Sequence, residues 1–387
     1  MNLSDLRSDN ELIDLFCSMA EVPSPSLKEE NIINRICKYC KENNLNCELD
    51  EYKNIYITVK ATDETKEPIL LSSHMDVIGD DSPVKPYLDG DLIKAEGRTL
   101  GADDKAGVAN ALFFAKELNK RTDLKHGGLE VHFTRDEENT MTGIKNTDFS
   151  KIKSKYALVL DSDALGQCLT SGASYVMVDL KISAPKGGHS GNDIGDSTRE
   201  NATKLIADLV SELPQGVFYS ENNQVVTSCN IGGIESGDLN VTNVINTDAH
   251  ATYSIRSSNK TKEDELIKLM QETVDNFNKE YKGIATATIT FTVKMPMFEK
   301  NEDEYLPILF ETVAKKLGIT PEISSFHAGA ETHIYANKQN ANGETFSPYL
   351  IGLATVCNMH SKREYVEYKT MIKGQELLKA LFEAYNS

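Results

Sequence analysis

Two short stretches constrain this chain most, because each joins an apolar run to ligand-type side chains. Residues 69–76 read Ile-Leu-Leu-Ser-Ser-His-Met-Asp, an apolar run that stops at a His-x-Asp pair. This pattern predicts a buried parallel strand that ends in polar residues. Residues 100–107 read Leu-Gly-Ala-Asp-Asp-Lys-Ala-Gly and predict a loop that delivers a carboxylate and then enters a helix. Because open α/β sheets place sites at the carboxyl ends of strands, we predict a metal centre that includes His74, Asp76 and Asp103.

The first part of the chain alternates helical patterns with short apolar runs. Helices are predicted at 11–20, 27–43 and 105–119, and strands at 46–51, 54–60, 68–73, 128–134 and 156–160. Residues 79–98 are rich in Pro and Gly and predict a loop or a small hairpin. This alternation favours an α/β class fold in which a mixed sheet is sandwiched by helices.

The pattern changes near Gly172, where strict apolar–polar alternation begins. Strands are predicted at 175–182, 225–234, 247–256 and 285–293, with helices at 197–213 and 266–281. The order β-α-β-β-α-β is that of an α+β split βαβ unit, a ferredoxin-like arrangement. We therefore predict an inserted lid domain at 174–294 and a discontinuous catalytic domain formed by 1–173 and 295–387. The returning segment predicts a helix at 304–317 and strands at 322–327 and 349–353.

The charge and cysteine content of the chain exclude several classes of protein. Its 41 Lys and Arg stand against 59 Asp and Glu, a formal net charge of −18. Such a surface repels phosphate, so no nucleic acid and no membrane is expected as a partner. The first residues lack the basic-then-apolar pattern of a signal peptide. The seven cysteines show no disulfide-like spacing, and together these features predict a cytoplasmic enzyme.

Five polar clusters follow predicted strands or lie in loops. They are His74-Met-Asp76, Asp103-Asp104, Asp136-Glu-Glu138, Asp161-Ser-Asp163 and His360. Each cluster alone is a weak signal, because single histidines and acidic pairs are common on protein surfaces. Together they supply the imidazoles and carboxylates of a two-metal site, in which one carboxylate bridges both ions. Glu137 adds a free carboxylate that can take a proton from a metal-activated water.

Four of the motifs occur in a characteristic order. They are Ser73-His-Met-Asp-Val77, Leu100-Gly-Ala-Asp-Asp-Lys-Ala-Gly107, Asp136-Glu-Glu138 and Gly187-Gly-His-Ser-Gly191. In these motifs the chain resembles the two-zinc metallopeptidases that include carboxypeptidase G, peptidase T and the aminoacyl-histidine dipeptidases. The resemblance covers nearly the whole chain, including the predicted insertion, and implies the zinc-peptidase fold of that family.

The resemblance also implies roles for individual residues. The implied metal ligands are His74 and Asp161 on one Zn²⁺, Glu138 and His360 on the other, and Asp103 between them. Co²⁺ or Mn²⁺ would be able to substitute. Asp103 is preferred to Asp104 as the bridge because the family's bridging Asp stands two residues before a Lys, here Lys105. Asp76, which would orient the His74 ring, Glu137, which would be the general base, and His189 are the implied catalytic residues.

Substrate-binding residues are implied in the insertion and in a late loop. His189 matches a histidine that reaches toward the scissile carbonyl oxygen, and Asn243 and Arg256 match positions that contact substrate. Two alternatives stay open, in which Asn243 is a turn residue and Arg256 pairs with surface carboxylates. Residues 327–333, His-Ala-Gly-Ala-Glu-Thr-His, differ from peptidase T and are more similar to the aminoacyl-histidine dipeptidases. Glu331 in this loop is the candidate partner of a substrate ammonium, or else a solvated carboxylate.

The leading hypothesis is a zinc-dependent exopeptidase, a peptidase T-like tripeptidase or dipeptidase that cleaves short peptides from the free amino end. An N-acyl amino-acid amidohydrolase uses the same carbonyl chemistry and stays open as an alternative. A catalytically silent metal-containing peptide-binding protein would have lost Glu137 or a metal ligand, and none is lost. The expected partner is a short peptide, and a homodimer formed through the insertion stays open.

Overall fold

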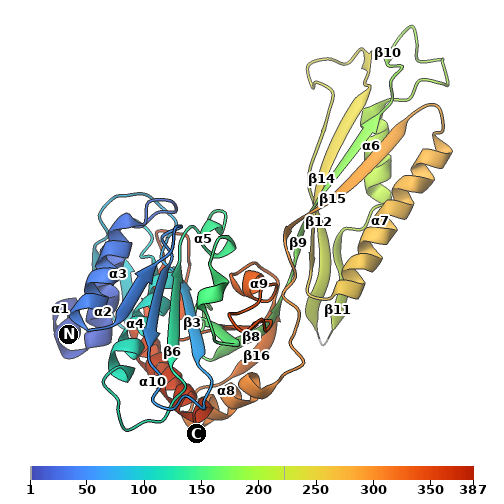
Figure 1. Ribbon diagram of the computed structural model, residues 1–387. Helices are drawn as coiled ribbons and strands as arrows, with labels where there is room; N and C mark the ends of the chain where they lie inside the picture. Colours follow the sequence, from blue (N-terminus) through green and yellow to red (C-terminus); the bar gives the residue numbers. More distant parts are fainter. Residues whose placement is uncertain (1, 222) are drawn as a thin grey trace. The chain divides into compact units, whose positions relative to one another are not determined.

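The computed structural model describes residues 2–221 and 223–387. One compact unit comprises the chain up to Ser171 together with Lys300–Ser324 and Ala330–Ser387. Its centre is an 8-stranded mixed sheet in the order β1-β2-β6-β3-β7-β17-β8-β16 (Figure 1). These strands are β1 (Asn46–Leu49), β2 (Ile55–Val59), β3 (Ile69–His74), β6 (Leu129–Thr134), β7 (Tyr156–Val159), β8 (Gln167–Gly172), β16 (Glu322–Phe326) and β17 (Ser347–Ile351). The predicted α/β class is confirmed.

The middle of this sheet is parallel and buried. β3 pairs in parallel with β6 on one side and with β7 on the other. All six residues of β3 and all four of β7 are buried, as their uninterrupted apolar runs predict. The three carboxyl ends therefore meet at one edge of the sheet, where the chain leaves β3 at His74, β6 before Glu137 and β7 before Asp161.

Helices cover both faces of the sheet. α4 (Ala102–Leu118) packs on β3, and α2 (Glu11–Ala20) and α10 (Tyr368–Tyr385) pack on α4. The short α9 (Thr332–Tyr335) packs against β7 and β17. The remaining helices of this unit are α1 (Leu3–Asp9), α3 (Glu30–Glu42), α5 (Thr142–Lys145), η1 (Phe149–Lys151) and α8 (Tyr305–Lys316). The long α10, which was not predicted, adds Leu377, Leu381 and Phe382 to the core.

A small antiparallel sheet lies beside the same edge. It has the order β18-β19-β5-β4, with β4 (Pro86–Asp89), β5 (Leu92–Ala95), β18 (Thr355–Cys357) and β19 (Tyr365–Glu367). β4 and β5 form the predicted hairpin. β18 and β19 were not predicted, and the loop between them carries His360. Pairing of β19 with β5 fixes the base of that loop.

The second compact unit comprises Gly172–Glu299 and Ser325–Gly329, so the predicted insertion at 174–294 falls within it. Its 5-stranded sheet has the order β11-β12-β14-β9-β15. The strands are β9 (Tyr175–Ser183), β11 (Gly216–Glu221), β12 (Gln224–Ser236), β14 (Asp248–Ser257) and β15 (Thr286–Met295), with β10 (Gly188–His189) and β13 (Val244–Ile245) as a separate pair. α6 (Ala202–Glu212) and α7 (Lys260–Glu280) pack on this sheet around a core of their own. The edge strand β11 is an addition to the predicted order.

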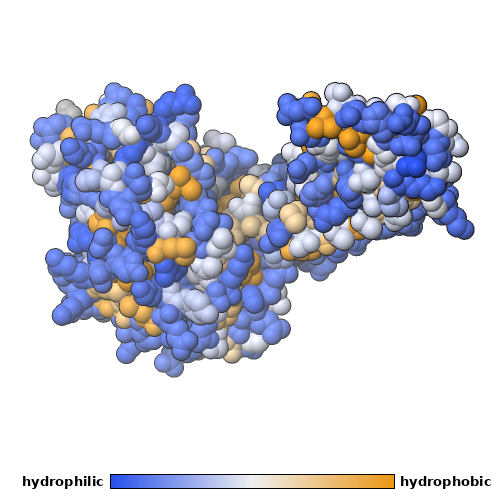
Figure 2. All heavy atoms as spheres, turned by 90° about the horizontal axis from the view of Figure 1, so that it is seen from above, coloured by the Kyte–Doolittle hydropathy of each residue, from blue (hydrophilic) through white to orange (hydrophobic). Residues whose placement is uncertain are grey.

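The surface agrees with the composition of the chain. Figure 2 shows a face that is largely hydrophilic, with hydrophobic side chains scattered over it. Among the described residues, no helix is both long enough and apolar enough to cross a membrane.

Candidate metal centre

His74 is the last residue of β3, and its ring orientation follows from its hydrogen bond. Nδ1 lies 3.0 Å from the backbone carbonyl oxygen of Asp76. Because a carbonyl only accepts, the neutral ring carries its proton on Nδ1 and presents the lone pair of Nε2. Nε2 lies 3.2 Å from Asp103 Oδ1 and 3.6 Å from Asp161 Oδ1. The ring is 1% exposed, and this hydrogen bond directs Nε2 toward the two carboxylates.

Asp103 stands between two imidazoles. Its Oδ1 faces His74, and its Oδ2 lies 3.1 Å from Nε2 of His360. The preceding turn requires Gly101, which has a φ of +74° and whose Cβ, if present, would lie 2.8 Å from Val77 Cγ1. Asp103 itself has non-helical backbone angles at the start of α4. One oxygen toward each histidine is the arrangement that a bridging carboxylate needs.

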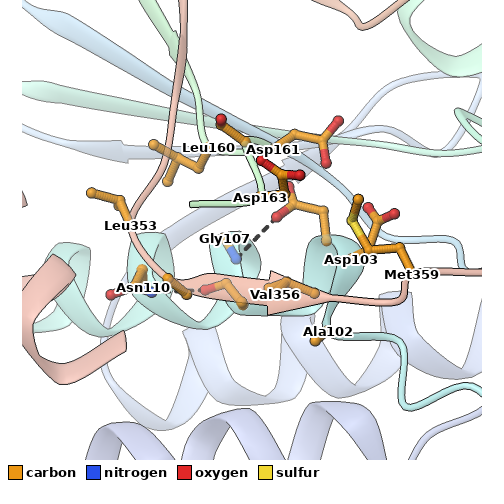
Figure 3. A pocket seen from close by; sticks show the side chains of 14 residues that line it. Ala102, Asp103, Gly107, Asn110, Leu160, Asp161, Asp163, Leu353, Val356 and Met359 are labelled. Carbon is orange, nitrogen blue, oxygen red and sulfur yellow. Dashed lines mark hydrogen bonds between the residues drawn. The ribbon is translucent and has the colours of Figure 1, made fainter. Parts of the chain in front are cut away.

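The remaining predicted ligands complete the cluster. Glu138 Oε2 lies 2.9 Å from His360 Nε2, and Asp161 follows β7 beside His74. The residues form two groups, and within each group the ligand atoms all lie within 4.8 Å of one another. One group is His74, Asp103 and Glu138, and the other is His74, Asp104 and Asp161. Figure 3 shows Asp103 and Asp161 among the side chains that line one pocket beside α4. The structure thus brings together all five predicted ligands from distant parts of the sequence.

The charge balance of this cluster fits divalent cations. Oε1 of Glu138 is buried without a hydrogen-bond partner among the described residues. Burial raises the pKa of Glu138 and the pKa of Asp161 above their usual ranges, and neighbouring carboxylates add to the rise. Burial works against His74, yet the charges of Asp161, Asp103 and Asp76 raise its pKa. Buried carboxylates without enough positive charge are costly, and two divalent ions would remove that cost.

Asp104 lies next to the bridge but has different contacts. Its Oδ1 accepts a hydrogen bond of 3.0 Å from the backbone N–H of Gly107, within α4. A Cβ on Gly107 would lie 2.4 Å from that oxygen, so only glycine fits there. Oδ2 is buried without a partner among the described residues. Of these two neighbouring carboxylates, Asp103 has an oxygen near each histidine, whereas Asp104 bonds within α4.

Glu137 lies beside the ligands without joining them. Its backbone N–H donates to Asp76 Oδ1 over 2.9 Å. Its carboxylate makes no hydrogen bond within the described part of the chain, and it belongs to neither set of ligand atoms. Burial raises the pKa of Glu137 well above its usual range, and the negative charges of Asp161 and Glu331 contribute. A free carboxyl with a raised pKa is suited to exchange protons with a bound water.

Comparison with known proteins agrees with this geometry. The sequence pattern of peptidase family M20/M25/M40 matches residues 70–384. The chain belongs to this family. It is therefore a metallopeptidase. It is 27% identical over 332 residues to YqjE of Bacillus subtilis, an uncharacterized protein, covering 85% of this chain and 84% of YqjE.

Two further likenesses carry functional names. The chain is 31% identical over 229 residues to the cytosol non-specific dipeptidase of Escherichia coli, covering 51% of this chain and 46% of the dipeptidase. The crystal structure of aminopeptidase PepT from Bacillus cereus superimposes with a TM-score of 0.84 at 25% identity, over 97% of this chain and 98% of PepT.

The centre of this peptidase is supported by a loop between α2 and α3, residues 22–29, part of which was predicted to belong to a helix beginning at 27. Ser26 Oγ donates to Asp76 Oδ2 over 2.7 Å. The buried Glu29 accepts from the backbone N–H of Asp136 over 3.1 Å and pairs with Arg135. Lys105, 1% exposed, donates to the carbonyl of Val22 over 2.6 Å. The loop therefore braces both β3 and the 136–138 turn.

Glu331 lies in the interior of the peptidase and not in solvent. It is 1% exposed, and its Oε2 accepts from Ser72 Oγ over 3.4 Å. Tyr335 OH donates to the same Ser72 over 3.0 Å and lies 2.6 Å from His132 Nδ1. Oε1 of Glu331 has no partner among the described residues, and burial raises the pKa of Glu331 to about 7. The alternative of a solvated loop carboxylate is therefore wrong.

His189 and Asn243 lie together in the second unit. β10 pairs with β13, so His189 stands opposite Val244, and Ser190 N–H donates to Asn243 O over 3.0 Å. His189 Nδ1 accepts from the backbone N–H groups of Gly191 and Asn192, at 3.1 and 3.3 Å. The neutral ring therefore carries its proton on Nε2. Within the described chain, no residue bonds to Nε2, so the ring offers one free donor.

Arg256 lies near the other end of the same unit, on β14. Its guanidinium stacks on the Tyr175 ring, 4.4 Å from the centroid. It forms no ion pair with any residue that the structure describes, so the alternative of surface pairing is not supported. His327 shares this neighbourhood, since burial and the charge of Arg256 lower its pKa, and its Nε2 lies 2.7 Å from Ser228 Oγ. The sequence motif around His327 could have indicated a polar site here.

Proposed function

We propose that this peptidase is a two-zinc exopeptidase that cleaves di- and tripeptides from their free amino end. The main support is the free carboxylate of Glu137, whose backbone N–H is bonded to Asp76, next to five converging candidate ligands. The likeness to aminopeptidase PepT and to a dipeptidase supports short peptides as substrates. All seven cysteines are free, which supports the expected cytoplasmic location.

The residues of the centre divide into holding and proton-transfer roles. The proposed ligands are His74 and Asp161 for one ion, Glu138 and His360 for the other, and Asp103 for both. When bound, the two Zn²⁺ ions, or Co²⁺ or Mn²⁺, would lower the pKa of a water and polarise the scissile carbonyl. Glu137 takes the proton of the attacking water and returns it to the leaving amine. Asp76 fixes the Glu137 main chain and the His74 ring, so neither has to reorganise during the reaction.

His189 supplies a donor for the oxyanion in this proposal. Its Nε2–H is free because two backbone N–H groups occupy Nδ1. A neutral donor of this kind can stabilise negative charge on the carbonyl oxygen without first losing a proton. Asn243 immediately precedes β13, the strand paired with β10, and its backbone carbonyl accepts from the Ser190 N–H. Both residues are therefore assigned to substrate contact.

Arg256 is assigned to the carboxylate of the peptide, since a half-buried guanidinium without an acidic partner is a ready anion site.

The distance between Arg256 and His189 within one chain is too long for a short peptide. β14 is 10 residues long, about 30 Å at ~3.3 Å per residue, whereas an extended tripeptide spans about 10 Å. β10, which contains His189, lies beyond one end of β14 (Figure 1), and Arg256 is the ninth residue of β14, near its other end. One short peptide cannot contact both residues of one chain, which supports a homodimer in which His189 and Arg256 on each substrate come from different chains.

Glu331 is assigned to the substrate ammonium. Its unpartnered Oε1 and raised pKa are those of a carboxylate that lacks a cation, and an ammonium would supply one. Because Glu331 is 1% exposed, an ammonium can reach it only after a local rearrangement of the residues around it. An N-acyl amino-acid amidohydrolase would have no use for this carboxylate, which is why the exopeptidase is preferred.

A substrate panel tests the proposal. Free di- and tripeptides should be hydrolysed at least about tenfold faster than their N-acetylated forms, a difference of ~1.4 kcal/mol in transition-state binding. Chelation should abolish turnover, and Zn²⁺ should restore it. Glu331→Gln should reduce the difference in hydrolysis rate between free and acetylated peptides. Glu302→Gln, an exposed control, should leave that difference unchanged. Faster cleavage of the acetylated peptides would move the protein to the amidohydrolase class.

A further inference from the structure

Glu364 is a buried carboxylate in the loop that carries His360, and it is not one of the candidate ligands or catalytic residues. It is 1% exposed. Its Oε2 accepts hydrogen bonds from the Thr99 hydroxyl and, over 2.8 Å, from the backbone N–H of Gly101. Its Oε1 accepts a hydrogen bond of 3.2 Å from the backbone N–H of Asp103. All three donors thus belong to the short segment that delivers the bridging carboxylate.

These contacts supply what that segment lacks. The N-cap of α4 is Gly101, which has no side chain to accept from the first N–H groups of the helix. Asp103 has non-helical backbone angles, φ −81° and ψ 106°, so its position does not follow from helix geometry. A carboxylate that accepts from backbone N–H groups forms hydrogen bonds about twice as strong as neutral ones. Glu364 therefore fixes the main chain of Asp103 from outside the helix.

The same residue also fixes the other side of the centre. Its backbone N–H donates to Ser361 O over 3.1 Å, and Ser361 Oγ donates to Asn358 O over 2.6 Å. These bonds close the turn in which His360 adopts a φ of +58°. Figure 3 shows Met359, the residue before His360, beside Asp103 in the pocket that both line. One side chain thus connects the turn of His360 to the segment of Asp103.

We propose that Glu364 is a positioning residue that presets the spacing between Asp103 and His360 before any metal binds. The structure holds Asp103 Oδ2 3.1 Å from His360 Nε2, and without Glu364 the two segments would have to be ordered by the metal itself. The inference rests on the proposed metal centre and not on the proposed substrate. Its expected consequence is a loss of metal affinity, about 10- to 100-fold, as for partners that orient ligands elsewhere.

Metal titration of the metal-free full-length chain tests this directly. Zn²⁺ affinity is measured by competition with a chromophoric chelator, and the visible absorption of the Co²⁺-loaded chain reports ligand geometry. Glu364→Gln keeps the shape of the side chain but removes its charge and turns an amide toward backbone donors. Glu367→Gln, on β19 at the end of the same segment, is the matched control. We expect weaker Zn²⁺ binding and an altered Co²⁺ spectrum for Glu364→Gln only.

The thermal unfolding midpoint of each metal-free variant separates positioning from folding. A lowered midpoint with wild-type Zn²⁺ affinity and Co²⁺ spectrum would show a structural role alone and overturn the proposal. If Glu364→Gln does not fold, Thr99→Val carries the test, because it removes one donor and keeps the carboxylate. Its Zn²⁺ affinity should fall at least about twofold, and an unchanged affinity would overturn the proposal. A chain that binds metal normally but fails to cleave peptides would count against the proposed function and not against this inference.

Discussion

The carboxylate of Asp76 accepts a 2.9 Å hydrogen bond from the backbone N–H of Glu137, and this bond connects the end of β3 to the turn after β6. The other Asp76 oxygen accepts from Glu138 N–H over 3.2 Å and from Ser26 Oγ over 2.7 Å. The His74 ring bonds to the backbone carbonyl of the same residue. Asp76 therefore organises the proposed base and two ligands at once, a wider task than the orientation of His74 alone.

The first prediction follows from this organisation. Asp76→Ala should lower kcat about 10- to 100-fold or more, because the turn that carries Glu137 and Glu138 loses its acceptor. Ser26→Ala removes one of the donors and should cost only a few-fold. Steady-state kinetics on a free dipeptide, with metal content measured on the same samples, gives both values. Equal, small effects of the two substitutions would contradict the organising role.

A second prediction separates the proposed base from the proposed bridge. Glu137→Gln should retain near-normal metal content and lose about 10²- to 10⁴-fold in kcat, since only proton transfer is removed. Asp103→Asn should lose metal, because one side chain faces both histidines. Metal analysis of the purified variants, after gentle preparation, checks both, and the wild type should hold two ions per chain. Retention of most of the rate by Glu137→Gln would place the base elsewhere.

Much of this centre could be predicted because its residues follow buried strands. The apolar run before His74 and the one before Asp161 each indicated a strand end, and parallel strand ends meet at one edge. The choice of Asp103 over Asp104 required the family resemblance, since spacing alone does not separate the two neighbouring carboxylates. In the structure Asp103 faces both histidines, whereas the backbone of Glu137 is bonded to Asp76.

The supporting residues could not be predicted in this way. Ser26 contacts Asp76, and Glu364 contacts Asp103, across long stretches of chain. Neither contact leaves a periodic signal, because each depends on how loops fold against the sheet edge. β18 and β19 were missed because both are only three residues long, too short for a visible alternation. α10 is different, since its amphipathic pattern was readable and could have been predicted.

A third prediction concerns His189 and the number of chains in the active form. His189→Ala should lower kcat about 10²- to 10³-fold and leave metal content intact, as for the loss of one oxyanion donor. Co-expression of the His189→Ala chain with the Glu137→Gln chain tests whether His189 acts on a partner's substrate. Random pairing would then give mixed dimers with one intact site and recover about a quarter of wild-type activity.

The control for that experiment co-expresses two chains. One carries both His189→Ala and Glu137→Gln, and the other carries Glu137→Gln alone. This mixture should give no recovery, because no site then contains both side chains. Sedimentation of the wild type should show a dimer at the assay concentration. A monomer, or a mixture no more active than its two parts, would show that His189 acts within its own chain or does not act.

The last prediction concerns the pH dependence of stability and tests the burial of Glu331. In the metal-free protein, burial raises the pKa of Glu331 from 4.5 to about 7. The folded state therefore binds this proton more tightly than the unfolded state does. The resulting stabilisation is fully present below pH 4.5 and is lost as the pH rises through about 7, a change of about 3 kcal/mol for such a shift. Gln cannot ionise, so Glu331→Gln should lack this loss of stability, and urea unfolding of both metal-free proteins between pH 4.5 and 8 measures the difference.

The exposed-site variant Glu302→Gln should keep the wild-type pH dependence of stability. Parallel stability curves for the wild type and Glu331→Gln would mean that the Glu331 carboxyl is solvated or paired in the folded chain, and it would then be no better suited to receive a substrate ammonium than any surface carboxylate.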